Sequence, residues 1–187
     1  MKLNQIIAFL TLVAALLNGN TVQALKDGKI AATDNTLFVR KQITGANVVK
    51  LIDGTTERVT GITNVDGNKL DDYRNFIIEA ISIRYGTDAS ETDPGVISYT
   101  TTPPTALRNA ELVLRQGNRM VINMPVHALI PGVSASPASV DGDRFKNMIW
   151  ALIVEGQKFE LNLEFADGAS FGANNHFVEV NLHGAET

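Results

Sequence analysis

The side chains that could do chemistry are few, and the histidines come first. The chain has three, His127, His176 and His183, and no cysteine. A Ser-His-Asp hydrolase needs a nucleophile on a sharp turn with a histidine in reach, and no Gly-x-Ser-x-Gly occurs. His176 and His183 lie seven residues apart, on opposite faces of a regular strand, so they cannot hold one zinc ion together. We therefore interpret all three as surface or hydrogen-bonded structural histidines.

Oxygen-bearing side chains gather in one short segment that could bind calcium. Asp66, Asn68, Asp71 and Asp72 stand close together in the sequence. The segment lacks both the Asp-x-Asp-x-Asp-Gly order and the final Glu of an EF-hand loop. Tight turns select Asp and Gly on their own account, and residues 141–143 repeat the pattern in shorter form. We expect turns and no cofactor, with calcium at the first segment as the open alternative.

Two other carboxylates could form a catalytic pair. Glu79 is a charge inside an apolar run, and Glu164 belongs to a cleanly alternating segment. Glycoside cleavage would need two such acids facing each other, which sequence spacing cannot establish. We expect Glu79 to be a satisfied structural carboxylate and the protein not to be an enzyme. A carbohydrate-active sandwich, with Glu79 or Glu164 in an acid pair, remains a third hypothesis that rests on fold analogy alone.

The composition is that of an ordinary globular domain. The 187 residues are 44% hydrophobic and 19% charged, with a formal net charge of −4. This length suits one domain with a sizeable core. A nucleic-acid surface normally requires a basic excess, so direct sequence-specific binding of nucleic acid is not expected.

From residue 25 onward the pattern predicts strand after strand. Alternating or β-branched runs separated by Gly, Pro, Asn and Asp are typical of an antiparallel sandwich. We expect an all-β domain over residues 25–187, an antiparallel β-sandwich of jelly-roll type with eight to nine strands. The expected strands are 36–43, 48–52, 58–63, 74–85, 111–114, 120–126, 145–154, 157–165 and 176–183, with a further short candidate at 96–100.

Three turns predict hairpins. Asp53-Gly54 would join 48–52 to 58–63, and Gly117-Asn118 would join 111–114 to 120–126. Glu155-Gly156 would close the clearest hairpin, between 145–154 and 157–165. The segment 74–85 is apolar on both faces, which is typical of a central strand. Strict alternation would place Ile77, Ile81, Ile83 and Tyr85 on one face and Phe76, Ile78 and Ala80 on the other.

The first 24 residues allow two interpretations. Lys2, an apolar core over 6–17 and the exit Val22-Gln23-Ala24 have the layout of a signal peptide. The core is too short to span a bilayer, which takes about 20 residues. As a retained helix it would present one apolar face for assembly or membrane contact, made of Ile6, Phe9, Leu10, Val13, Leu16 and Leu17. We expect retention, with cleavage of residues 1–24 as the alternative.

The pattern of strands and turns resembles jelly-roll capsid proteins of tailless icosahedral bacteriophages, many of which contain an internal membrane. The resemblance is carried by Arg74-Asn75-Phe76-Ile77-Ile78, which leads a long strand, and by Asn109-Ala110-Glu111-Leu112-Val113-Leu114, a hairpin that ends in Met124-Pro125-Val126. It covers most of residues 25–185. Such proteins often carry two jelly rolls in tandem, whereas this chain has room for one.

The resemblance implies a structural virion protein without catalytic residues. Its partners would be copies of itself, other capsid proteins and, through the N-terminal helix, an inner membrane. The alternative is an exported β-sandwich, such as a binding protein or a pilus or surface-layer subunit, that is secreted or held at the cell surface after residues 1–24 are removed.

Overall fold

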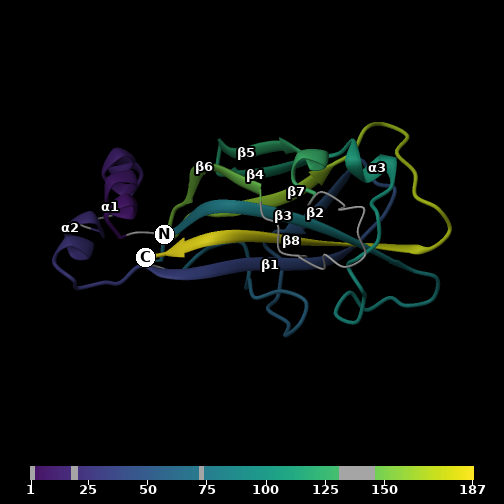
Figure 1. Cartoon of the computed structure of the whole chain (residues 1–187), viewed down its shortest axis with the longest axis horizontal. Coiled ribbons are helices and arrows are strands. Elements are labelled where there is room, and N and C mark those ends of the chain that lie inside the picture. The colour runs from purple at the N-terminus through teal and green to yellow at the C-terminus, as the bar shows by residue number, and fades with distance from the viewer. Residues whose placement is uncertain (1–2, 18–20, 72–73, 131–145) are drawn as a thin grey trace, which may run out of the picture.

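The computed structural model describes residues 3–17, 21–71, 74–130 and 146–187. The elements, labelled in Figure 1, are α1 (Leu3–Leu12), η1 (Ala14–Leu16), α2 (Thr21–Lys26), β1 (Thr33–Ile43), β2 (Val48–Ile52), β3 (Phe76–Asp88), α3 (Thr105–Arg108), β4 (Glu111–Gln116), β5 (Arg119–Pro125), η2 (Val126–Ala128), β6 (Lys146–Ile153), β7 (Phe159–Glu164) and β8 (Asn175–Glu186).

The eight strands of the described chain form two four-stranded antiparallel sheets. One sheet has the order β1-β8-β3-β6 and the other the order β2-β7-β4-β5. The two sheets lie in two layers, which Figure 1 shows one above the other. The predicted antiparallel β-sandwich is therefore confirmed.

Strand pairing is nested along the chain. β1 pairs with β8, β2 with β7, β3 with β6, and β4 with β5. The β1–β8 ladder is long, running from Thr33 opposite Glu186 to Ile43 opposite His176. Pairing of β3 with β8 and of β4 with β7 completes the two sheets. The strands thus follow the path of one long antiparallel hairpin wrapped around a core.

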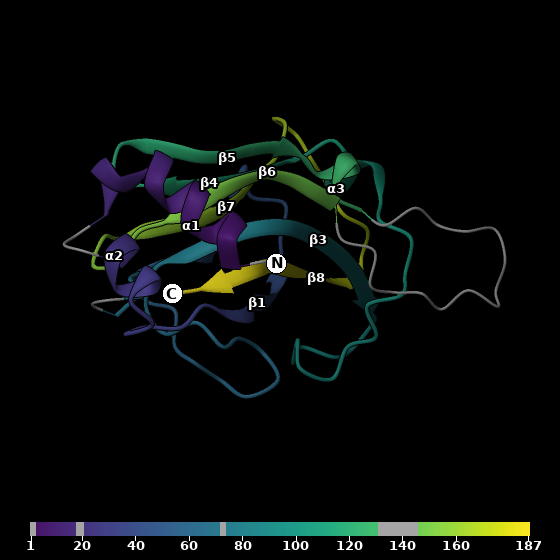
Figure 2. The same cartoon turned by 60° about the vertical axis from the view of Figure 1, so that its left-hand side comes forward.

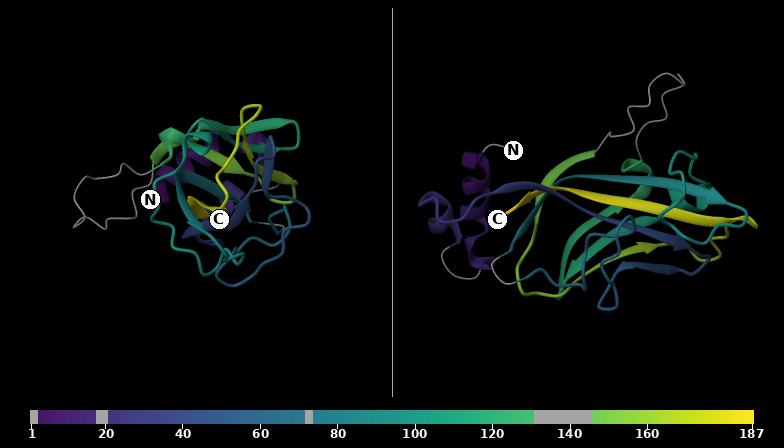
Figure 3. Two further views of the ribbon diagram at one scale, coloured as in Figure 1. Left: turned by 90° about the vertical axis from the view of Figure 1, so that its right-hand side faces the viewer. Right: turned by 90° about the horizontal axis from the view of Figure 1, so that it is seen from below.

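The main core lies between the sheets and follows the two-residue period of the strands. Leu161 and Leu163 of β7 point into it, as do Val178, Val180 and Leu182 of β8. These side chains are buried, as the alternating pattern of both segments predicts. The view from below in Figure 3 shows the elongated shape of the sandwich, and the end-on view shows its compact cross-section.

The alternation of β3 is interrupted by a bulge, so the predicted faces were wrong. The register against β8 shifts between Ile78 and Ala80, which leaves Glu79 as an extra residue. A bulge moves every later side chain to the other face. Phe76 and Ile78 before it, and Ile81, Ile83 and Tyr85 after it, consequently all belong to the main core. β3 is a central strand, as predicted.

Two predicted hairpins were wrong, one because its turn joins strands of different sheets and the other because its second strand does not form. β6 and β7 flank Glu155-Gly156, yet β6 pairs with β3 while β7 pairs with β2 and β4. Residues 58–63 form no strand after the Asp53-Gly54 turn. Residues 58–63 belong to a turn, and residues 62–64 contact the outer edge of β1. Arg40 N donates to Ile62 O at 2.8 Å, and Phe38 N donates to Asn64 Oδ1 at 2.9 Å.

The predicted β4–β5 hairpin is confirmed. Gln116 pairs with Arg119, and Gly117 between them has φ of +55°. That conformation suits glycine because it has no Cβ. Residues 96–100, the short candidate, form no strand. They lie over β3 instead, with Ile97 and Ser98 so close to Gly86 that a Cβ there would overlap them.

The N-terminal helices cover one end of the sandwich. Figure 2 shows α1 in front of the strand ends near the C-terminus, with α2 beside it. α2 crosses the predicted boundary at residue 24, and β1 begins at Thr33. None of the described helices is both long and apolar enough to cross a membrane.

Candidate functional site

The predicted contact face of α1 packs against the chain's own sheet. Ile6 and Leu10 are buried in a second apolar cluster, separate from the main core. The sheet contributes Ile77 of β3, Leu152 of β6, Val154 and Ala185 to it, and Leu25 of α2 joins them. Ile77 faces this cluster because it lies on the surface of β3 opposite the main core.

The other members of the predicted face lie at the margin of this cluster. Phe9, Val13 and Leu17 are partly buried against it, and the Phe9 ring meets the Trp150 ring edge-on at 5.5 Å between centroids. The side chain of Leu16 lies outside the described residues. Contact of this face with a neighbour or a membrane stays a prediction, and Ile6 and Leu10 are enclosed within the chain.

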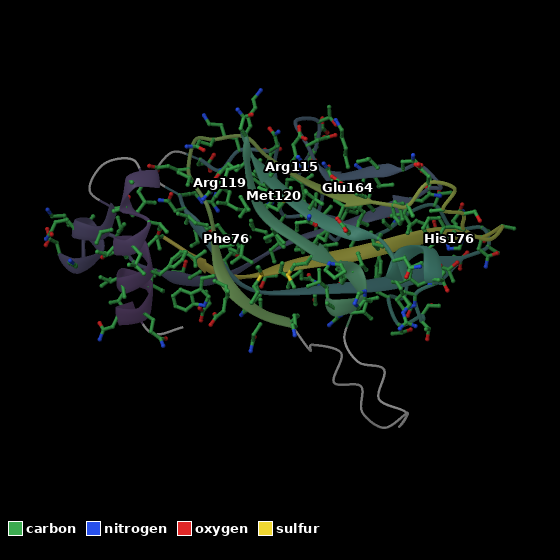
Figure 4. The ribbon with its side chains drawn as sticks, turned by 90° about the horizontal axis from the view of Figure 1, so that it is seen from above. Phe76, Arg115, Arg119, Met120, Glu164 and His176 are labelled. Carbon is green, nitrogen blue, oxygen red and sulfur yellow. The ribbon has the colours of Figure 1, made fainter. Side chains whose placement is uncertain are left out.

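An apolar groove lies beside α1, between the edge strands of the two sheets. β5 ends one sheet and β6 ends the other, so the outer edges of both strands lack a strand partner within the described chain. The groove has a volume of about 510 Å³, and Phe9, Val13, Met120, Ile149 and Trp150 are among the side chains that line it. Arg119 and Met120 lie at its β5 side, at the same end of the sandwich as Phe76 (Figure 4).

Two large apolar side chains that line this groove face solvent. Ile149 is 93% exposed and Met120 50%. Leu12 on α1 is 86% exposed but is not among the lining residues. Ile149 is turned outward where β6 bulges, since the residues paired with β3 jump from Ala151 to Asn147. We call Met120 and Ile149 the exposed patch. Sequence reasoning missed Met120 and Ile149, because both lie in apolar runs typical of interior strands.

The charge of the groove differs from that of the whole chain. The lining includes one cation, Arg119, and no carboxylate, although the protein carries 20 acidic residues. Arg119 is itself engaged, with one guanidinium nitrogen donating to Gln116 Oε1 at 3.0 Å and to Leu152 O at 2.8 Å. The groove is therefore an apolar surface free of the acids that would repel a second acidic protein.

Glu179, a buried carboxylate, forms ion pairs with two partly exposed arginines on the outer face of the β1-β8-β3-β6 sheet. Glu179 Oε2 accepts from Arg40 Nε at 2.7 Å, and Glu179 Oε1 lies 3.5 Å from an Arg84 nitrogen. Tyr99 covers Arg40, with 5.3 Å from the guanidinium carbon to the ring centroid, and burial raises the pKa of the Tyr99 phenol. The contact between Tyr99, in the loop after β3, and Arg40 of β1 holds this loop against the sheet.

The three histidines take structural positions and do not meet. His127 lies in η2, as expected after a strand end, and His183 Nδ1 is 2.9 Å from Thr36 Oγ1. His176 is buried and bonded to Tyr85. The burial of His176 could have been predicted from the sequence. It lies an even number of residues from Val178, Val180 and Leu182, so its side chain lies on the same face of the strand.

The acidic candidates are not brought together either. Glu79 lies at the β3 bulge and Glu164 on β7, in different sheets, and Glu164 Oε1 accepts from Arg115 at 3.4 Å. Asp71 pairs with Arg74 at 3.0 Å, and Asp66 is an exposed residue beside the positive-φ turn at Gly67.

The described residues hold no group of three or more histidine or acidic side chains suited to a metal ion. Of the calcium candidates, Asp72 lies outside the described residues, as do residues 141–143. Calcium at Asp66, Asn68, Asp71 and Asp72 stays the open alternative to the expectation of no cofactor.

Comparison with protein-family models, with curated protein sequences and with solved structures finds no match to this chain.

Proposed function

We propose that the sandwich is a jelly roll and that the protein is a structural subunit of an icosahedral virion shell. The supporting observation is the nested pairing of strands. When a hairpin of four strand pairs wraps around a core, alternate pairs fall into opposite sheets. The pairs β1–β8 and β3–β6 share one sheet here, and β2–β7 and β4–β5 share the other.

A fold by itself does not assign a function, because lectins and cupins also use jelly rolls. Two features favour a shell subunit over these. The exposed patch and its groove combine unpaired strand edges with apolar side chains, and such surfaces mark sites of protein association. The acids and histidines singled out in the sequence are spread over separate parts of the described structure, which favours a structural protein over an enzyme.

The surface that we propose to join subunits includes only part of the expected face, since Phe9 and Val13 line the groove. Ile6 and Leu10 stabilise the fold of a single chain, so assembly would use the exposed patch. The partners would be copies of this chain and other capsid proteins. An inner membrane, if the shell encloses one, would be met on the side of α1 that carries Leu12.

The test is the assembly state of the purified full-length chain. Sedimentation velocity should detect oligomers that Ile149→Glu dissociates, because the carboxylate would be buried in the contact. Val96→Glu is the matched control, since Val96 is also an exposed apolar residue but lies outside the groove. Equal dissociation by both variants would contradict the role of the patch, and a strictly monomeric wild type would contradict the proposal.

The alternative function is an exported β-sandwich subunit from which residues 1–24 have been removed. The signal-like layout of those residues favours it, while the packing of α1 opposes it. Removal would expose Ile77, Leu152 and Val154, which are buried beneath α1. The intact mass of the protein from its native source decides, since cleavage after residue 24 lowers it by about 2.5 kDa.

A further inference from the structure

The groove between β5 and β6 contains most of the chain's sulfur. The protein has four methionines and no cysteine. Three of the methionines, Met120, Met124 and Met148, are among the residues that line this groove. Met120 and Met124 come from β5 and Met148 from β6, so both sheets contribute. Thioether sulfur is a common target of peroxides, and this chain has no thiol that would react first.

The three methionines differ in their exposure to solvent. Met120 is 50% exposed, whereas Met124 and Met148 are partly buried and pack against the main core. Figure 4 labels Met120 on β5, beside Arg119. The sulfur of a methionine must meet the oxidant in order to react, so exposure determines the order of oxidation. We therefore expect Met120 to be oxidised before the other two.

The reaction is a two-electron oxygen transfer from a hydroperoxide such as hydrogen peroxide. A lone pair of the Met120 sulfur attacks one peroxide oxygen, so that the S–O bond forms and the O–O bond breaks. The other peroxide oxygen takes the proton of the transferred one and leaves as water. Sulfur is oxidised to the sulfoxide while the peroxide is reduced, and an apolar side chain becomes a polar hydrogen-bond acceptor.

The groove is a poor environment for a sulfoxide that has lost its water. Phe9 and Ile149 in the lining have no hydrogen-bond donor, and Arg119 already donates to a side-chain and a main-chain oxygen. Of the two asparagines in the lining, Asn123 lies three residues further along β5, about 10 Å from Met120, and Asn147 belongs to β6. Covering the sulfoxide with a second subunit would remove water from its oxygen, which weakens the contact.

We propose that Met120 is a peroxide-oxidation site that controls association at the groove. Reduced Met120 belongs to the exposed patch and allows a second copy of the chain to bind there. Its sulfoxide keeps the groove hydrated and the subunit separate. A bound copy would shield Met120, so oxidation takes place on the free subunit and holds it in that state. The inference rests on the proposed assembly at the exposed patch, and it adds the modification that regulates this assembly.

Peptide mass spectrometry of the full chain treated with hydrogen peroxide tests the oxidation site. The treatment is made at a protein concentration low enough to keep the subunits separate. Met120 should gain one oxygen, about 16 Da, nearly as fast as free methionine added to the same solution. Met124 and Met148 should react at least about fivefold more slowly, because their side chains are partly buried. Equal rates at the three methionines would overturn the proposal.

Sedimentation velocity of the full chain, before and after limited oxidation, tests the effect on association. Oxidation of Met120 should raise the concentration needed for half association about tenfold, and methionine sulfoxide reductases should restore the original value. Met120→Leu should associate as the wild type does and should not respond to peroxide, because leucine has a similar volume and no sulfur. Met124→Leu is the matched control and should keep the wild-type response.

The outcomes distinguish this inference from the proposed function. An untreated wild type that stays monomeric contradicts both. An oligomer whose association is unchanged after oxidation of Met120 overturns the inference alone. A Met120→Leu variant that remains as sensitive to peroxide as the wild type does the same.

Discussion

Replacing Leu10 by alanine tests whether α1 is an integral part of the folded domain. Leu10 is fully buried between α1 and the outer face of the β1-β8-β3-β6 sheet. Leu12, two residues further along the same helix, is 86% exposed. Leucine and alanine have similar, favourable helix propensities, so the two substitutions differ mainly in the packing they remove.

The expected magnitude follows from burial. Removing a buried leucine side chain to alanine costs about 2–5 kcal/mol, and a value of about 3 kcal/mol suits a site at the edge of a small cluster. Leu12→Ala should change the free energy of unfolding by less than about 0.5 kcal/mol. The free energy gained by packing α1 on the sheet sets an upper limit to this cost. If that free energy is smaller than the cost of the cavity, α1 leaves the sheet in Leu10→Ala, and the free energy of unfolding falls only by the packing free energy of the helix.

Urea unfolding of the full chain measures both variants. With a slope of about 2–3 kcal/mol per molar, a loss of about 3 kcal/mol lowers the midpoint by about 1–1.5 M. The chain has a single tryptophan, Trp150, whose ring contacts Phe9 of α1. Its fluorescence therefore reports undocking of the helix as well as global unfolding.

Equal midpoints for Leu10→Ala and Leu12→Ala, with unchanged Trp150 fluorescence, would refute the packing of α1. A leader peptide that the folded domain does not need would give that result. A selective loss in Leu10→Ala would show that residues 3–17 belong to the stable structure.

Two further predictions concern the C-terminal strand. Gly184→Ala should prevent the β3–β8 pairing or cost more than about 3 kcal/mol in urea unfolding, because a Cβ there would overlap the carbonyl oxygen of Ile77; Gly172→Ala, with open space around it, is the control. Glu186→Gln should cost about 1 kcal/mol at neutral pH, since Arg74 lowers the pKa of the Glu186 carboxyl. The stability that comes from the lowered pKa of Glu186 is fully present above the ordinary carboxyl pKa of 4.5, and it is lost as the pH falls through the lowered pKa. The urea midpoints of the variant and the wild type should therefore converge as the pH is lowered.

The sequence predicted strands well where the signal was local. The β4–β5 hairpin depends on Gly117 and on two short flanking runs, and both its strands and its turn were found. The alternation of 157–165 and of 176–183 likewise placed the correct side chains in the core. Periodicity reports which side of a strand is buried, and it needs no knowledge of the partner strand.

Strand pairing and the β3 bulge could not be predicted in the same way. The Glu155-Gly156 turn looks like a hairpin turn because the flanking runs are both typical strands, yet β6 and β7 bind partners in different sheets. Thr33 pairs with Glu186, and the local sequence around these two residues does not indicate that their strands are paired. The extra residue at Glu79 reverses the faces of β3, and a charged residue in an apolar run was its only local sign.

The candidate site was predicted only in outline. An apolar stripe on the N-terminal helix is visible in the sequence, but the stripe does not say what covers it. Ile77 and Leu152, which cover Leu10, look like ordinary core residues of strands. Ile149 looks the same, and only the bulge in β6 turns it to solvent.

Electron microscopy of the purified full-length protein, imaged over a range of salt and protein concentrations, tests the central claim most directly. A shell subunit should form closed particles or rings of uniform diameter, and Ile149→Glu should form fewer of them than Val96→Glu. Separate single subunits under every condition, with wild type and variants alike, would contradict the account.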